Sequence, residues 1–230
     1  MTESVGSTPS SRENAAQICF ESFQAPAYYS MHRSVLSLFA SGRTRGLVVQ
    51  SGYGLTSVVP IFEGYALPHA SVTLPLAGVD ISRQLKKQLS DENALFASME
   101  DHLIEDIKKV TCAVHNKVGE ALPIEQYELP DGSIVDISSK IRTSVPELLF
   151  EPNCEGNNTL GLPALIRKSI AMCDRDLQKD LRSGIVLAGG TSMLSGRKKL
   201  RMFLKTTTME VNVDACRIIL SPHARIRRLA

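Results

Sequence analysis

The amino-acid sequence predicts a globular α/β protein, or one of the related α+β class. Of its 230 residues, 43% are hydrophobic and 22% are charged, which is enough to bury a core in one large or two small domains. Segments with helical apolar spacing are interspersed with short β-branched segments. Two of the β-branched segments run directly into glycine turns, which can present backbone N–H groups to a phosphate.

Two helices are predicted before the first strand. The first runs from about Arg12 to Phe23, because Ser10 to Glu13 have capping-box spacing and the apolar residues that follow recur at helical intervals. This helix stops before Pro26, since the residue preceding a proline disfavours the helical conformation. The second helix covers residues 30–40 and ends at a Ser-Gly pair.

A β-hairpin follows the two helices. Residues 46–49 and 56–62 are apolar and β-branched, and Ser51-Gly52-Tyr53-Gly54 between them has turn chemistry. A third strand is predicted over residues 71–76. A helix from Asp80 to Leu89 comes next, with Asp80 as its N-cap.

The clearest helical period in the sequence marks a helix from about Glu100 to His115. Its apolar face consists of Met99, Leu103, Ile107, Val110 and Val114. The period therefore places Lys108 and Lys109 on the other face.

A second hairpin and a further strand with a glycine turn complete the pattern. The hairpin joins residues 127–129 to residues 134–137 through a Pro-Asp-Gly turn. A loop rich in Gly and Asn then leads into one long helix over residues 163–182. An apolar strand over residues 184–188 enters the turn Gly189-Gly190-Thr191 and is followed by a helix over residues 194–205.

The turns Ser51-Gly52-Tyr53-Gly54 and Gly189-Gly190-Thr191 each follow an apolar strand. Together they indicate a two-loop phosphate clamp, because both would direct backbone N–H groups toward one ligand. Neither turn matches the Walker or the dinucleotide-binding pattern. The alternative is that both are ordinary turns, which are far commoner than phosphate sites.

Charge and cysteine content argue against several classes of function. The net charge of +2 favours neither nucleic acid nor a membrane as partner. The basic clusters at residues 197–201 and 225–228 are interpreted as a solvated helix face and a charged tail, with nucleic acid or an acidic filament surface as the alternative. The five scattered cysteines indicate neither disulfides nor zinc, and no apolar stretch is long enough to span a bilayer. We therefore expect a cytoplasmic protein, with the nucleus as the alternative.

Several long stretches carry a resemblance that is more specific than any short motif. They include Phe20–Phe23, Val35–Thr44, Val59–Ala70, Tyr127–Gly132, Pro146–Phe150 and Ala188–Thr191. In order and almost residue for residue, these stretches are similar to actin, and the similarity extends from about Thr2 to Pro222. The chain is identified as a member of the actin family. The resemblance implies a partial actin/Hsp70/hexokinase-like fold, which is ribonuclease H-like.

The resemblance also implies how the chain is divided. It predicts a leader over 1–11, a remnant of the first large-lobe subdomain over 12–40, an inner subdomain over 41–76 and 158–222, an outer insertion over 77–157, and a divergent basic tail over 223–230. Because the similarity begins at the family's second quarter and ends after Pro222, we expect the first phosphate hairpin and the final segments to be missing. A face normally covered by those pieces would be exposed or covered by a partner.

Members of this family hold a nucleotide in a cleft between two phosphate hairpins and an adenosine pocket. By resemblance, Ser51, Gly52 and Gly54 belong to the second phosphate hairpin, Gly78 and Lys108 to the cleft wall, and Gly189, Gly190, Thr191 and Met193 to the adenosine-side loop. No cofactor is firmly expected, and the resemblance leaves residual ATP binding by these residues open. No metal ligand and no catalytic residue is expected.

The departures from the family pattern concern hydrolysis. Gln50 and Tyr53 stand where the family has two Asp residues that help to hold magnesium, so the protein's negative charge at the metal is lost. Arg33 and Ser57 replace the Gln that orients the attacking water and a neighbouring His, and Lys109 replaces a Glu that faces the ribose. Each such loss lowers the rate by about 10²-fold or more, so we expect no turnover of ATP.

These features favour a non-catalytic actin-like protein that binds other proteins, with actin or actin-binding proteins as candidate partners and the cytoskeleton as its location. An ATP-binding nucleotide switch with weak or no hydrolysis is the alternative function. A third interpretation is a truncated product that scarcely folds, which a cooperative thermal transition would exclude.

Overall fold

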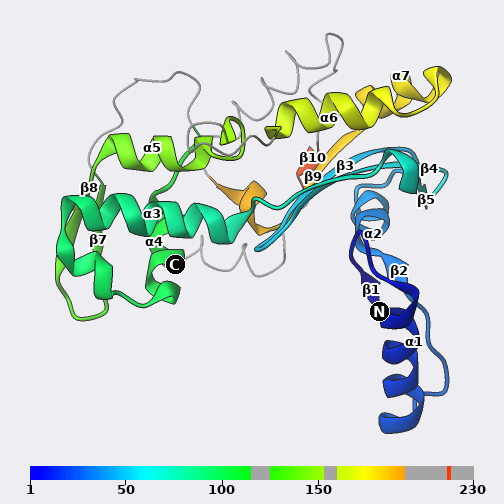
Figure 1. Ribbon diagram of the computed structural model, residues 1–230, viewed down its shortest axis with the longest axis horizontal. Helices are drawn as coiled ribbons and strands as arrows, with labels where there is room; N and C mark the ends of the chain where they lie inside the picture. Colours follow the sequence, from blue (N-terminus) through cyan, green and yellow to red (C-terminus); the bar gives the residue numbers. More distant parts are fainter. Residues whose placement is uncertain (115–124, 153–159, 195–216, 219–230) are drawn as a thin grey trace.

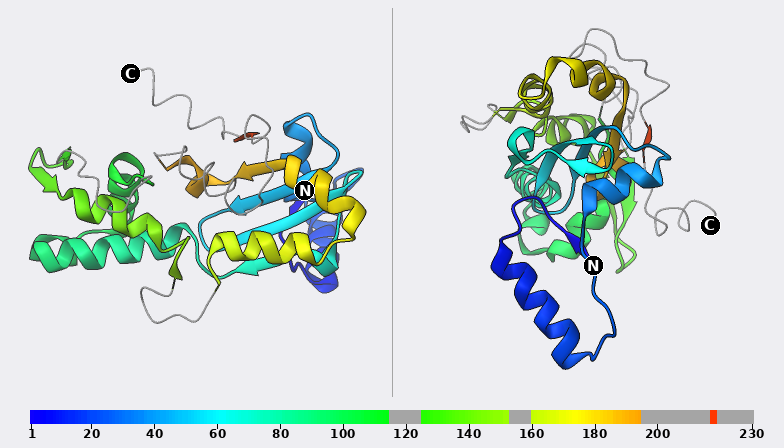
Figure 2. Two further views of the ribbon diagram at one scale, coloured as in Figure 1. Left: turned by 90° about the horizontal axis from the view of Figure 1, so that it is seen from above. Right: turned by 90° about the vertical axis from the view of Figure 1, so that its right-hand side faces the viewer.

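The computed structural model describes residues 1–114, 125–152, 160–194 and 217–218. Figure 1 shows a twisted sheet with helices on both faces, and a helical region that lies at one end of it. The first helix of the chain extends away from the other end, as the two further views in Figure 2 also show. None of the helices in the described ranges is both long and apolar enough to cross a membrane.

The sheet has six strands in the order β10-β9-β3-β4-β5, with β6 also paired to β4. The strands are β3 (Gly46–Ser51), β4 (Thr56–Phe62), β5 (Tyr65–Ala66), β6 (Val72–Leu74), β9 (Ile185–Ala188) and β10 (Arg217–Ile218). The β3–β4 hairpin is antiparallel, whereas β3 and β9 run parallel and are far apart in sequence. The sheet is therefore mixed, as in an α/β protein with a long crossover connection.

Strand β3 is buried on both faces because its side chains alternate between two hydrophobic clusters. Leu47 and Val49 belong to the large cluster, and Val48 packs on the opposite face with Val35 and Leu38. Those last two residues come from helix α2 (Arg33–Ala40). Helices α6 (Leu162–Ala171) and α7 (Arg175–Ser183) cover the other face of the sheet.

The helical region at the end of the sheet comprises three α-helices, a 3₁₀ helix and a hairpin that pack into the large cluster. These are α3 (Gly78–Glu92), the 3₁₀ helix Ala94–Ser98, α4 (Asp101–Thr111), α5 (Ser139–Glu147), and the strands β7 (Glu125–Glu128) and β8 (Ile134–Ile137). Buried Leu85, Ile107 and Ile141 represent the three helices in that cluster. The region thus extends the core of the sheet rather than forming a separate core.

The N-terminal part of the chain contains a short parallel pair of strands. Strand β1 (Thr2–Glu3) pairs with β2 (Met31–His32), which directly precedes α2. Between them lie α1 (Pro9–Gln17) and a π-helical turn, Ile18–Ser22, and no residue of either is fully buried. The helix predicted over residues 12–23 is confirmed, although it begins at Pro9.

Histidine 32 caps helix α2 and makes its stability depend on pH. The Ser34 amide donates to His32 Nδ1 at 3.3 Å, and burial, followed by the nearby charge of Arg33, lowers the pKa of this imidazole below 6.5. The unfolded chain therefore binds more protons than the native chain between the native pKa and 6.5, so stability is complete above that window and falls as pH drops through it. Protonation also removes the acceptor of the cap, which is worth about 1 kcal/mol.

We expect the urea-unfolding free energy of the chain to decrease between pH 7 and pH 5. The His32→Asn variant keeps a capping acceptor but does not titrate, so the part of the slope that His32 contributes should vanish in it. Identical pH profiles for the two chains would show that His32 does not cap α2.

Most of the predicted elements are confirmed, including both hairpins and the helices that became α2, α3 and α4. The assignment of Asp80 as the N-cap of α3 is wrong, because the helix begins at Gly78 and the Asp80 carboxylate accepts from the Ala77 amide at 2.9 Å. The single helix over residues 163–182 is wrong. The chain leaves the helical conformation at Asp174, whose φ and ψ are −56° and 144°. On either side of this break, Cys173 and Leu181 pack in one buried cluster with Ala70. The helix predicted over residues 194–205 lies outside the described residues.

The buried face of α4 also differs from the prediction. Val110 is 55% exposed, while Lys108 is only 8% exposed and lies with Ile104, Ile107 and Thr111 on the inner face. The interpretation of Lys108 as part of the face opposite the core is therefore wrong. A lysine side chain can pack its aliphatic stem in the core when its ammonium group finds acceptors. Strands β1, β2, β5 and β10 and helix α5 were not predicted, and residues 31–32 of the predicted helix over 30–40 form β2 instead. The division into subdomains stays a prediction.

Candidate functional site

Both glycine turns follow the carboxyl ends of neighbouring strands, at the same end of the sheet. In the parallel pair β3–β9, Val49 lies opposite Leu187 and Gln50 lies opposite Ala188. Each strand then ends within one residue, so the turns that begin at Ser51 and Gly189 come out side by side. In open α/β sheets, ligands bind in the crevice outside the carboxyl ends of parallel strands. The structure thus brings together the two turns that the sequence singled out.

Glycine 189 is the point where the two turns touch. Its φ is +97°, and a Cβ atom there would lie 2.1 Å from the carbonyl oxygen of Ser51. No L-residue with a side chain fits this position without moving the backbone. The glycine is thus required by the close approach of two backbones, whether or not a ligand binds.

A chain of hydrogen bonds links the two turns to the helical region. The Thr191 hydroxyl donates to the Gly52 carbonyl oxygen at 2.8 Å, and the Gly78 amide donates to the same oxygen at 3.1 Å. The Val79 amide donates to the Tyr53 carbonyl oxygen at 2.7 Å. The first turn is therefore held on one side by the second turn and on the other by the start of α3.

Lysine 108 completes this chain from helix α4. Its ammonium group donates to the Gly78 carbonyl oxygen at 2.8 Å and to the Ser82 hydroxyl at 2.8 Å. Burial lowers the pKa of Lys108 below 10.5, because the charged form loses its hydration. Ser82 was missed by the sequence reasoning, although it lies four residues after Gly78 and thus on the same side of α3.

The remaining predicted site residues lie around this centre. The Ser51 hydroxyl is buried and shares a 2.9 Å hydrogen bond with the Thr56 hydroxyl. Gly54 and Gly190 face open space, since a Cβ atom at either position would meet no atom within 4 Å. Met193 ends a 3₁₀ helix, Gly190–Met193, and is half-buried.

Three of the residues that depart from the family pattern lie close together in the fold. Gln50 and Ser57 are cross-strand partners on β3 and β4, and the Gln50 side-chain oxygen accepts from the Ser34 hydroxyl at 3.1 Å. Arg33 precedes Ser34, but its guanidinium donates to the hydroxyl of Ser4. These contacts connect the start of α2 to the end of β3 through neutral groups.

The other two departures lie at the surface. Tyr53 is 62% exposed at the tip of the first turn, and Lys109 forms an ion pair with Asp106 at 2.9 Å. Within the described ranges, no group of three or more His, Cys, Asp or Glu side chains is placed so that it could hold a metal ion.

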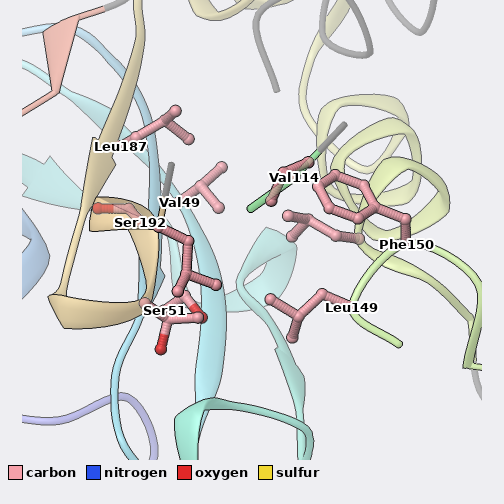
Figure 3. A pocket seen from close by; sticks show the side chains of 10 residues that line it. Val49, Ser51, Val114, Leu149, Phe150, Leu187 and Ser192 are labelled. Atoms are coloured by element: carbon pink, nitrogen blue, oxygen red, sulfur yellow. The ribbon is translucent and has the colours of Figure 1, made fainter. Parts of the chain in front are cut away.

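A small cavity opens behind the two turns, between the sheet and the helical region. Figure 3 shows Val49, Leu187, Ser51 and Ser192 on its sheet side, with Val114, Leu149 and Phe150 facing them. The space within it is about 30 Å³, which holds a few water molecules at most. Most of the described side chains that line it are apolar, so the cavity offers few polar groups to a ligand.

The mixed sheet and the helices on both of its faces define an α/β protein, with the two glycine turns side by side at the ends of β3 and β9. The family model described as Actin matches residues 1–228 of the chain. Because that match covers almost the whole sequence, the chain belongs to the actin family. The family resemblance found in the sequence is thereby confirmed, and so is the actin-like fold.

Proposed function

We propose that this chain is a non-catalytic member of the actin family that binds other proteins, either in cytoskeletal assembly or within a larger complex. The observation that carries the proposal is that the polar groups of the candidate site bond to one another. The Thr191 hydroxyl, the Gly52 carbonyl and the Lys108 ammonium all have protein partners at 2.8 Å. A nucleotide would have to compete with these bonds to use the same groups.

The residues around the end of β3 support the absence of hydrolysis. Hydrolysis of ATP needs a group that orients the attacking water and usually carboxylates that help to hold magnesium. By the family resemblance, Gln50 and Ser57 stand at positions where the family has such groups, and the Gln50 side-chain oxygen accepts from the neutral Ser34 hydroxyl. None of these three side chains supplies a negative charge, so the electrostatic stabilisation of a metal-bound phosphate is weak.

Exposed apolar side chains at the N-terminal end support a role in protein binding. Ile18, Phe20, Phe23 and Tyr29 are between 48% and 75% exposed, and they lie on or just after the helix that extends from the sheet. Exposed aromatic side chains are enriched at surfaces that bind proteins. Actin or actin-binding proteins are the partners we propose, with the cytoplasm and its cytoskeleton as the location, and neither nucleic acid nor a membrane as a binding partner.

The alternative function is an ATP-binding switch, and the open surroundings of Gly54 and Gly190 favour it. Equilibrium titration with a fluorescent ATP analogue separates the two functions. We expect no binding at micromolar concentrations. The matched control is the Gly190→Leu variant, which adds a side chain to open space at the mouth of the site. Micromolar binding by the native chain that is lost in this variant would favour the switch and contradict our proposal.

A further inference from the structure

Serine 4 lies at the end of strand β1 and next to the first turn of α2. The parallel register of β1 and β2 places Thr2 opposite Met31 and Glu3 opposite His32. Ser4 follows directly, and its hydroxyl accepts a hydrogen bond from Nη2 of Arg33. Two bonds hold the backbone here, because the amide and the hydroxyl of Ser7 both donate to the Ser4 carbonyl oxygen, at 3.3 Å and 3.0 Å. An exposed serine hydroxyl is thus presented to a guanidinium in a fixed turn.

The ion pairs around Ser4 and Arg33 leave the positive charge of Arg33 unbalanced. The carboxylate of Glu3 is neutralised by Arg12, whose Nε lies 2.8 Å from it, and it also accepts from the Ser30 hydroxyl. His32 has a lowered pKa and is neutral at pH 7. Among the ion pairs of the described residues, none involves Arg33, so the cluster of Glu3, Arg12 and Arg33 carries one net positive charge. An anion placed on Ser4 would meet a cation without an anionic partner.

We propose that Ser4 is a phosphorylation site and that Arg33 binds the phosphate. A protein kinase would supply the phosphoryl group from a nucleoside triphosphate. A bond forms between Ser4 Oγ and the γ-phosphorus, the bond between that phosphorus and the β–γ bridging oxygen breaks, and the hydroxyl proton passes to a base of the kinase. The product places two negative charges and three acceptor oxygens beside the planar donor pair of Arg33.

This phosphate would strengthen a link that the unmodified chain already has. The neutral hydroxyl offers Arg33 one hydrogen bond, whereas a phosphate accepts two parallel bonds from a guanidinium. A continuous series of contacts would then run from Ser4 after β1 through Arg33 to its neighbour Ser34, whose hydroxyl donates to the Gln50 side chain near the end of β3. Phosphorylation would therefore fix the N-terminal strand against the start of α2. The inference does not depend on the proposed function, because it rests on contacts outside the two glycine turns.

The test uses the full chain with phosphoserine incorporated at position 4 and titrates its phosphate by ³¹P NMR. The second pKa of phosphoserine is ordinarily about 6. We expect the value at position 4 to lie at least about 0.5 unit lower, because a nearby cation favours the dianion. The control is phosphoserine at position 98, an exposed serine whose hydroxyl donates only to the Leu95 carbonyl oxygen.

The Arg33→Gln variant keeps a hydrogen-bond donor but loses the charge, so the pKa at position 4 should return to the value at position 98. The Arg33→Lys variant keeps the charge without the planar donor pair and should give an intermediate shift. Mass spectrometry of the chain recovered from its own cells should find phosphate on Ser4. Equal pKa values at the two positions, no effect of Arg33→Gln, or an unmodified Ser4 in those cells would each overturn the proposal.

Discussion

The Gly189→Ala variant is expected to lose about 3 kcal/mol or more of unfolding free energy, because the new methyl group meets the neighbouring backbone. A Cβ atom at this position would lie 2.1 Å from the Ser51 carbonyl oxygen, and the native φ of +97° is unfavourable for alanine. The two turns can only separate if the pairing between β3 and β9 gives way at its end. Urea unfolding followed by circular dichroism measures the loss.

Glycine 190 is the matched control for this substitution. It is the next residue in the same turn, but a Cβ atom there would meet nothing within 4 Å. The Gly190→Ala variant should therefore change the unfolding free energy by no more than about 0.5 kcal/mol, as substitutions away from strained or packed positions do. Similar effects of the two alanine substitutions would mean that the turns do not touch as described.

The Lys108→Glu variant is expected to have the second large effect. It would put a carboxylate where the native ammonium group donates to the Gly78 carbonyl oxygen and the Ser82 hydroxyl. A carboxylate that faces the Gly78 carbonyl oxygen in a buried place, without a cationic partner, costs about 3 kcal/mol or more. Glu105 lies one turn away on the same helix, so the new charge would also be repelled.

Lysine 109 provides the comparison for this prediction. Its side chain is 58% exposed and pairs only with Asp106 at the surface. The Lys109→Glu variant makes the same change of charge one residue further on, and it should cost less than about 1 kcal/mol. Thermal unfolding of both variants in one buffer checks the difference. If Lys109→Glu were the more damaging change, helix α4 would have to face the other way.

Local signals explain why much of the fold could be predicted from the sequence. The hairpins are fixed by turn residues beside β-branched segments, and α2 and α3 by caps and glycines next to apolar periods. Lys108 shows where such signals fail. Counting apolar residues assigned it to the face opposite the core, because no helical period reveals that two acceptors of α3 lie within reach of its ammonium group.

The candidate site combines local and long-range features. Each glycine turn could be predicted from its own residues, and the family resemblance selected the other site residues. The contact between Thr191 and Gly52 joins residues 139 positions apart, and it exists because β3 and β9 pair in parallel. The break at Asp174 and the bond between Arg33 and Ser4 likewise depend on packing between distant segments.

The rate of magnesium-dependent ATP hydrolysis by the purified chain tests the proposed loss of catalysis most directly. The sample must first show a cooperative thermal transition, so that a lack of activity is not a lack of folding. The comparison is the Thr191→Val variant, which keeps the shape of the side chain and removes its bond to the Gly52 carbonyl oxygen. We predict that both chains hydrolyse ATP no faster than buffer alone. Turnover by the native chain that is abolished in Thr191→Val would contradict a non-catalytic function.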